Sequence, residues 1–212
     1  MLPQDIFTQH TQIGLDLDET LASTFAGMLQ IAHSAGRLIS CQTTEDFIIH
    51  DIFDDPSFGV TRDEMIDIWH QYNLSIKKPE DTMVVEKSLQ GVNLLMQHGA
   101  QCAIITARNG NDPIKRKMTI EWVSYHFPHI SLSDLHFVNH YSSESLPKSS
   151  VCKNLGITLL IDDHIDNARD MIDAGLSVIL LEKPWNRDII FDHPNLYRVK
   201  NWQEIIDNLS SK

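Results

Sequence analysis

Two acidic pairs in the sequence have residue types and spacing that could do chemistry. Asp16 and Asp18 lie at the end of the apolar run TQIGLDL, and Asp162 and Asp163 follow the apolar run ITLLI. Adjacent carboxylates repel one another unless a cation compensates them, and Mg²⁺ prefers hard oxygen ligands of this kind. Acidic pairs also occur at helix N-termini and in solvated loops. Because both pairs end apolar runs, we favour a metal held by Asp16 and Asp162, with Asp18 left free.

A hydroxyl and a lysine stand where they could bind an anion. Thr106 ends the apolar run QCAIIT and is followed by Ala107 and Arg108. A hydroxyl at a strand end can bind phosphate oxygens together with the backbone N–H groups of the next turn, although a lone Thr more often caps a helix. Lys148 could offer a fixed positive charge to phosphate and to a carboxylate. Lys153 competes for that role, and either lysine could be an ordinary surface residue.

These residues need strands that end at one edge of a sheet. Five short apolar runs predict buried strands, at residues 11–17, 101–106, 134–139, 157–161 and 176–181. Helical patterns lie at residues 81–98, 113–127, 166–174 and 201–209. Alternating strands and helices predict a three-layer, Rossmann-like α/β fold with a five-stranded, mainly parallel sheet. In such folds ligands bind at the carboxyl ends of the strands.

A long segment between the first strand and the helix before the second interrupts this alternation. It contains two helical patterns, at residues 21–35 and 61–73, and it is too long for a simple crossover. We therefore predict an α/β core formed by residues 1–20 and 81–212. Residues 21–80 would be a helical cap inserted over the strand ends.

The overall charge argues against some classes of partner. The chain of 212 residues has 17 Lys and Arg and 29 Asp and Glu, so the formal net charge is 17 − 29 = −12. This balance disfavours sequence-independent nucleic-acid binding and docking to an anionic membrane, but a local metal can still attract a small phosphorylated substrate. Three cysteines without a CxxC pair indicate a reducing compartment. With no recognisable membrane helix or signal peptide, we expect a cytoplasmic protein.

The ordered set of an acidic pair, a threonine, a lysine and a second acidic pair resembles the motifs of the haloacid dehalogenase-like superfamily of phosphotransferases. The resemblance extends from Ile13 to about Leu181, and the matching residues are Asp16, Asp18, Thr20, Thr106, Lys148, Asp162 and Asp163. The runs ITAR, EWV, IDDHIDNA and KPWNR are further similar to the 5′(3′)-deoxyribonucleotidase-type branch and its bacterial nucleotidase-like relatives. Glu19 stands where many members carry Gly, so we expect the turn after Asp18 to differ.

The resemblance implies an aspartyl-phosphate mechanism. Asp16 would attack phosphorus, and Asp18 would protonate the leaving oxygen and then accept a proton from water. Mg²⁺ would be held by the Asp16 carboxylate, the Asp18 backbone carbonyl and the Asp162 carboxylate, and it would neutralise charge that otherwise repels a dianion. Relatives that break carbon–halogen bonds lack the second Asp, so the resemblance favours phosphate chemistry.

The same resemblance assigns the remaining motif residues to binding and support. Thr106, Ala107 and Lys148 would hold the phosphoryl oxygens. Asp163 would orient metal-bound water or Lys148, and Thr20 would support the site.

Residues that would read the leaving group are less sharply defined. The cap aromatic side chains either stack on a base or form the cap's own small core. They are Phe25, Phe47, Phe53, Phe58, Trp69 and Tyr72. Outside the cap, Arg108, Trp185 and Arg187 would contact substrate or cap, or serve packing alone.

We therefore expect a Mg²⁺-dependent phosphomonoester hydrolase acting on nucleoside monophosphates. The alternatives are a phosphatase of another small metabolite such as a sugar phosphate, a phosphotransferase, and a non-catalytic relative that binds a phosphorylated ligand. A receiver-like phosphoacceptor is disfavoured, because receivers place the acidic pair before a lone phosphorylated Asp and lack a long insertion after the first strand.

Overall fold

The sheet of the α/β core has six parallel strands. The computed structural model describes residues 2–37, 40–49, 51–140 and 143–211. The strand order across the sheet is β3-β2-β1-β4-β5-β6. The strands are β1 (Gln12–Leu15), β2 (Gln101–Thr106), β3 (Leu135–Phe137), β4 (Leu159–Asp162), β5 (Ser177–Leu181) and β6 (Leu196–Val199). The predicted α/β class with a parallel sheet is confirmed, but the predicted count of five strands is one too few.

The strand that the sequence analysis missed is β6. It lies at one edge of the sheet, paired in parallel with β5. Its sequence is LYRV, and three of its four residues are only half-buried. An edge strand does not need the continuous apolar run that marks strands buried on both faces. For that reason the apolar-run criterion did not detect it.

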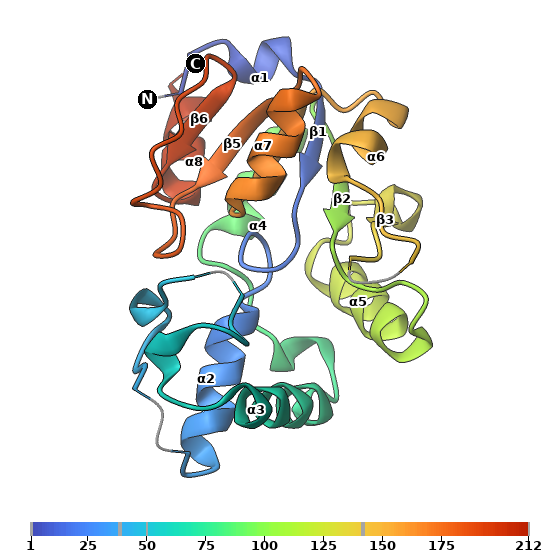
Figure 1. Cartoon of the computed structure of the whole chain (residues 1–212). Helices are drawn as coiled ribbons and strands as arrows, with labels where there is room; N and C mark the ends of the chain where they lie inside the picture. Colours follow the sequence, from blue (N-terminus) through green and yellow to red (C-terminus); the bar gives the residue numbers. More distant parts are fainter. Residues whose placement is uncertain (1, 38–39, 50, 141–142, 212) are drawn as a thin grey trace.

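Helices cover both faces of the sheet (Figure 1). One face packs against α1 (Ile6–Gln9), α4 (Ser88–Gln97), α5 (Pro113–His126) and α8 (Trp202–Ser210), and the other against α6 (Lys148–Asn154) and α7 (Ile165–Asp173). Successive strand residues point to opposite faces, so Leu159 and Ile161 of β4 join one apolar cluster and Leu160 joins the other. The molecule therefore has the predicted three layers. Among the described residues, no helix is long and apolar enough to cross a lipid bilayer.

The helix predicted at residues 81–98 begins only at Ser88. Before it, the backbone N–H of Val85 donates to the carbonyl of Leu21 at 2.7 Å, and Lys87 takes a left-handed conformation with φ of 65°. These interactions use the backbone groups that a longer helix would need. They also hold the segment around Val85 beside the segment around Leu21, which follows β1.

A second lobe lies below the sheet in Figure 1. It contains two helices, α2 (Thr24–Ser34) and α3 (Arg62–Ser75), and three short 3₁₀ turns, η1 (Thr44–Asp46), η2 (Pro56–Phe58) and η3 (Pro79–Asp81). Its buried apolar side chains form a second cluster, the cap cluster, which also includes Trp185 from the α/β core. The helices approach closely because Gly27 faces the ring of Tyr72, where an added Cβ would lie 2.5 Å from a ring carbon. Helices thus occur where the cap was predicted, and the limits of the insertion, residues 21–80, stay a prediction.

Candidate active site

The two acidic pairs meet because β1 and β4 are neighbours in the sheet. Leu15 pairs with Ile161, so the next residue of each strand is an aspartate, Asp16 and Asp162. The backbone N–H of Asp16 donates to the carbonyl of Ile161 at 2.9 Å, and both carboxylates are buried. Carboxylate oxygens of Asp16, Asp162 and Asp163 lie within 4.8 Å of one another. The register therefore builds one acidic cluster from segments far apart in sequence.

Lys148 is the lysine that enters this cluster. It is the first residue of α6, and its side chain is buried. The ammonium group donates hydrogen bonds to the carboxylates of Asp16 and Asp162, the latter at 2.8 Å. Lys153, near the end of the same helix, is exposed. Of the two lysines that the sequence left open, the structure brings Lys148 into the acidic cluster and leaves Lys153 at the surface.

Burial sets the protonation behaviour of the cluster. Burial raises the pKa of Asp16 well above its ordinary value, and the Lys148 charge offsets this only in part. For Asp162 burial acts in the same direction, but Lys148 and hydrogen bonds from the backbone N–H of His164 and the amide of Asn167 hold its pKa below the ordinary value. One lysine among three buried carboxylates leaves an excess of negative charge. A further cation is the natural compensation.

Asp18 lies outside the group of three carboxylates and has hydrogen-bond partners of its own. The Arg108 guanidinium donates to both oxygens of its carboxylate, at 2.7 and 3.0 Å, and the Thr24 hydroxyl donates at 2.6 Å. Burial acts to raise the pKa of Asp18, but Arg108 outweighs it and holds that pKa below its ordinary value. Arg108 also donates to the hydroxyl of Thr119 at 3.1 Å. The spacing of Asp16 and Asp18 carried no signal of this arginine partner.

Thr106 ends β2, next to β1 in the sheet, and its side chain is buried. Its hydroxyl accepts a hydrogen bond from the backbone N–H of Arg108 at 3.2 Å. The helix that follows is capped by Asp112 instead. Ala107 lies in the turn after the strand, where its carbonyl accepts from the backbone N–H of His140 at 3.0 Å. The capping alternative for Thr106 is thus wrong, and its role in binding phosphate stays a prediction.

Asp163, the third member of the cluster, accepts hydrogen bonds from neutral donors. Its carboxylate accepts from the Thr20 hydroxyl at 3.2 Å and from the Trp185 indole N–H at 3.0 Å. Asn186 donates to its backbone carbonyl at 2.7 Å. Burial, reinforced by the adjacent charge of Asp162, raises the pKa of Asp163 to about 6. Thr20 and Asp163, which the sequence linked only through a shared motif set, are in direct contact.

Glu19 occupies the position where the sequence departs from the superfamily pattern. Its φ is 59°, in the left-handed region that Gly adopts without strain. The side chain is buried, and its carboxylate accepts the backbone N–H of Phe25 in the first turn of α2 at 2.7 Å. Burial raises the pKa of Glu19 to about 8. The turn thus keeps a conformation typical of glycine while its side chain contacts the second lobe.

A family of known proteins matches almost the whole chain. The family model described as 5′ nucleotidase, deoxy (pyrimidine), cytosolic type C protein matches residues 10–212. The chain belongs to this nucleotidase family. It is therefore a phosphatase of the haloacid dehalogenase superfamily, as the motif resemblance implied. A nucleotidase of Clostridium acetobutylicum is 22% identical over 208 residues, covering 96% of this chain and 97% of that protein.

Solved structures share the fold of this nucleotidase-family protein. A haloacid dehalogenase family hydrolase of Deinococcus radiodurans, with bound phosphate and sodium, has a TM-score of 0.64 at 14% identity, covering 95% of this chain and 96% of that one. A haloacid dehalogenase-like hydrolase of Streptococcus pneumoniae has a TM-score of 0.59 at 14% identity, covering 94% and 98% of the two chains. At these identities the similarity shows the fold alone, over almost the whole length of both chains.

Most aromatic side chains of the second lobe, the predicted cap of this nucleotidase-family protein, pack together in its apolar cluster. Phe25, Phe47, Phe58 and Tyr72 are buried in the cap cluster, and Phe53 and Trp69 are partly buried against it. The ring of Trp69 faces the α/β core, with the Lys115 ammonium 5.9 Å from its centroid. The packing alternative thus describes the four buried rings. Among the predicted substrate residues, Arg187 is paired with Glu45 of the cap at 2.6 Å.

Three contacts of the site could not be predicted from the sequence. Asn167 donates to Asp162 at 3.0 Å, Asn186 holds the Asp163 carbonyl, and the Glu19 carboxylate holds the start of α2. Asn167 and Asn186 lie in the runs IDDHIDNA and KPWNR, which carried the resemblance, but no spacing rule separated them from their neighbours. Their roles depend on contacts between distant segments.

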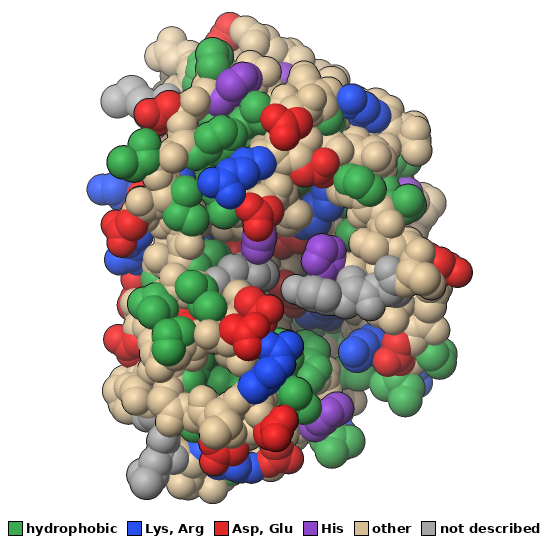
Figure 2. All heavy atoms as spheres, viewed as in Figure 1, with side chains coloured by type: hydrophobic (Ala, Val, Ile, Leu, Met, Phe, Trp, Pro, Cys, Tyr) green, Lys and Arg blue, Asp and Glu red, His purple; other side chains and the backbone are tan. Residues whose placement is uncertain are grey.

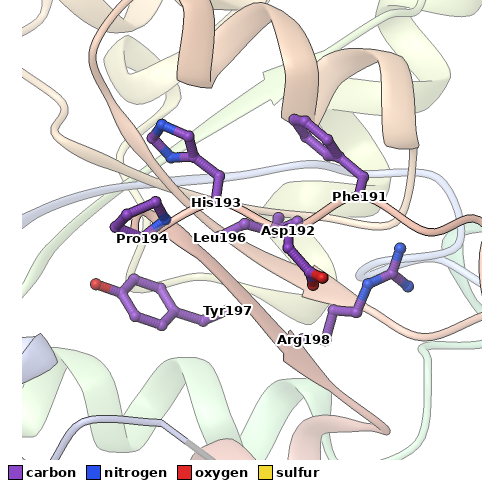
Figure 3. A pocket seen from close by; sticks show the side chains of 7 residues that line it. All are labelled: Phe191, Asp192, His193, Pro194, Leu196, Tyr197 and Arg198. Atoms are coloured by element: carbon purple, nitrogen blue, oxygen red, sulfur yellow. The ribbon is translucent and has the colours of Figure 1, made fainter.

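The surface has a hollow between the two lobes and, apart from it, a pocket beside β6. Figure 2 shows the surface hollowed between the two lobes, with acidic side chains inside and Lys, Arg and His side chains around it. A separate pocket lies beside the edge strand β6 (Figure 3). Its lining residues are Phe191, Asp192, His193, Pro194, Leu196, Tyr197 and Arg198. None of them belongs to the acidic cluster, so this pocket is not the active site.

Proposed function

We propose that the protein is a Mg²⁺-dependent phosphatase of nucleoside monophosphates that works through an aspartyl-phosphate on Asp16. The observation that carries the proposal is the buried cluster in which Lys148 joins Asp16 to Asp162, beside Asp163. The nucleotide as substrate is supported by membership of the nucleotidase family. The family description also supports the cytoplasmic location that we expect.

The residues present fit a divalent cation. The cluster offers buried carboxylate oxygens and has more negative than positive groups, and Mg²⁺ prefers such donors. The carboxylates of Asp16 and Asp162 and the backbone carbonyl of Asp18 would hold the ion. When bound, Mg²⁺ supplies positive charge that neutralises the phosphate dianion and the carboxylates around it. Burial raises the pKa of Asp16, and a cation beside its carboxylate would favour the ionised form.

Asp16 would be the nucleophile. It lies at the carboxyl end of a central strand, and its backbone is fixed by the hydrogen bond to Ile161. Lys148 orients one carboxylate oxygen and stabilises its ionised form. A carboxylate held in this way attacks phosphorus and forms an acyl phosphate, which water then hydrolyses.

Asp18 would move the protons of the two half-reactions. Its bond to Arg108 keeps it ionised, which suits the removal of a proton from the hydrolytic water. Donation of a proton to the leaving oxygen in the first half requires Asp18 to be protonated, and therefore requires the Arg108 pair to open. The Thr106 hydroxyl, the turn at Ala107 and Lys148 would hold the phosphoryl oxygens, while the cap excludes bulk water.

The test is phosphate release from 5′- and 3′-nucleotides, sugar phosphates and p-nitrophenyl phosphate, each with Mg²⁺ and with EDTA. We expect Mg²⁺-dependent release that favours nucleotides. Release from sugar phosphates alone would contradict the proposed substrate, and release that persists in EDTA would contradict the metal. The Asp16→Asn variant should fold normally and lose activity by several orders of magnitude, where each factor of ten corresponds to ~1.4 kcal/mol.

A further inference from the structure

The loop that follows β5 contacts both the acidic cluster and the cap. Trp185 donates its indole N–H to the carboxylate of Asp163 at 3.0 Å, and Asn186 donates to the backbone carbonyl of the same residue at 2.7 Å. The next residue, Arg187, pairs with Glu45 of the cap at 2.6 Å. Three consecutive residues therefore join one member of the candidate metal cluster to the second lobe.

The ring of Trp185 packs as part of the cap. Its centroid lies 5.3 Å from that of Phe25 and 6.4 Å from that of Phe47. Trp185 comes from the α/β core, whereas the other buried members of the cap cluster lie between Phe25 and Tyr72. The side chain is only 6% exposed. A displacement of the cap aromatic rings would therefore displace the indole as well.

The indole N–H is suited to orient a metal-cluster carboxylate. Asp163 is 1% exposed and lies against the charge of Asp162, so the direction of its carboxylate depends on its donors. Trp offers one N–H donor and no charge. It can orient Asp163 without competing with a cation for the cluster, whereas a lysine such as Lys148 adds positive charge.

We propose that Trp185 is a positioning residue that sets the orientation of the Asp163 carboxylate and couples it to the seating of the cap. This inference rests on the proposed function, because it assumes that the acidic cluster holds Mg²⁺. With the cap rings packed on the indole, the N–H stays on Asp163. Such coupling is reciprocal, so Mg²⁺ in the cluster would in turn stabilise the seated cap.

The first test is titration of the intact, metal-stripped protein with MgCl₂ in a calorimeter, without substrate. Trp185→Phe keeps an aromatic ring in the cap cluster and removes the N–H donor. We expect its affinity for Mg²⁺ to fall about tenfold, the lower end for loss of a residue that orients a metal ligand. The matched control is Trp122→Phe, because Trp122 is also buried and donates its indole N–H to the carbonyl of Thr82 at 2.9 Å. That variant should bind Mg²⁺ like the unsubstituted protein.

The second test addresses the coupling to the cap. Phe47→Leu changes the ring packed on Trp185 and leaves the indole and Asp163 intact. We expect it to weaken Mg²⁺ binding at least about twofold. Phe127→Leu is the control, since Phe127 is a buried ring that packs on Trp122 at 5.6 Å. Addition of Mg²⁺ should also change the tryptophan emission by the same amount in Trp69→Phe, Trp122→Phe and Trp202→Phe, because each of these variants keeps Trp185.

The outcomes separate this inference from the proposed function. If the unsubstituted protein binds Mg²⁺ and Trp185→Phe binds it equally well, the positioning role is wrong and the proposed function stands. If Phe47→Leu binds Mg²⁺ with unchanged affinity, or the emission does not respond, the coupling is wrong. If the unsubstituted protein does not bind Mg²⁺, both proposals fail. Thermal unfolding shows whether each variant is folded, and if Trp185→Phe is not, the Phe47→Leu and emission results decide.

Discussion

At the scale of single residues, Lys148 supplies the positive charge of the acidic cluster. It contacts both Asp16 and Asp162, and the side chains of all three residues are buried. Removal of one partner from a buried ion pair typically costs about 3–5 kcal/mol, because the remaining charge is left uncompensated. The position of Lys148 at the start of α6 therefore matters for stability as well as for the proposed binding of phosphate.

We expect Lys148→Met to lower kcat/KM by at least ~100-fold, a loss of transition-state stabilisation typical of a group that meets developing charge. The variant should also unfold at lower urea concentration in metal-free buffer. The control is Lys153→Met, the same change on the same helix at an exposed position. Equal activity of the two variants in a phosphate-release assay would remove Lys148 from the site.

Glu19 makes a prediction about pH. Burial raises the pKa of Glu19 to about 8 from its ordinary value of 4.5. Between these values the folded protein holds a proton that the unfolded chain has lost, so the free energy of unfolding falls as pH rises. In Glu19→Gln the side chain cannot titrate, so we expect this pH-dependent decrease in the free energy of unfolding to disappear. Its stability relative to the unsubstituted protein should therefore increase from about pH 5 to pH 8.

The measurement is urea unfolding at several pH values in metal-free buffer. Glu86→Gln is the control, because Glu86 is exposed and its replacement should leave the pH dependence unchanged. Parallel stability curves for Glu19→Gln and the unsubstituted protein would show that Glu19 is already ionised in the folded state.

At the scale of elements, most strands and the order of the polar residues at their ends could be predicted, because strands buried on both faces appear in the sequence as continuous apolar runs. β1 and β4 are apolar on both faces, and each ends in aspartates that the parallel register brings together. The edge strand β6 escaped because it is half-buried, and the start of α4 was misplaced because contacts with Leu21 fix the preceding backbone.

The contacts of the site were harder to predict than its motifs. The pairing of Asp18 with Arg108 and of Asp163 with Trp185 joins residues that are distant in sequence. No periodicity reports which side chain of a loop turns toward a given carboxylate. Sequence reasoning therefore found the residues of the cluster but left Asp18 unpartnered and Trp185 without a defined contact.

The packing of α2 on α3 makes a prediction about the cap. Gly27 faces the Tyr72 ring so closely that a methyl group would lie 2.5 Å from it. Gly27→Ala should therefore destabilise the protein by about 1–3 kcal/mol through overpacking, despite the better helix propensity of Ala. Urea unfolding measures the effect, with Ser34→Ala at an exposed position of the same helix as control. A gain in stability from Gly27→Ala would mean that the two helices separate easily.

At the scale of the whole molecule, the chain has a formal net charge of −12, and three of its carboxylates, Asp16, Asp162 and Asp163, meet in one buried cluster. A cation that binds only the folded state stabilises it by mass action. Addition of MgCl₂ should therefore raise the midpoint of thermal unfolding, and EDTA should reverse the shift. Asp162→Asn should remove most of the Mg²⁺-dependent shift, while Asp166→Asn, an exposed position on α7, should retain it. Equal shifts in both variants would place the cation elsewhere.

The proposed phosphatase reaction depends on one covalent step, the transfer of phosphate to Asp16. The most direct test is mass spectrometry of protein that is quenched in acid during turnover of a nucleoside monophosphate with Mg²⁺. We predict a phosphate on the peptide that contains Asp16, and none in Asp16→Asn or in the presence of EDTA. Full turnover by Asp16→Asn, or phosphate on a different peptide, would contradict the proposed mechanism.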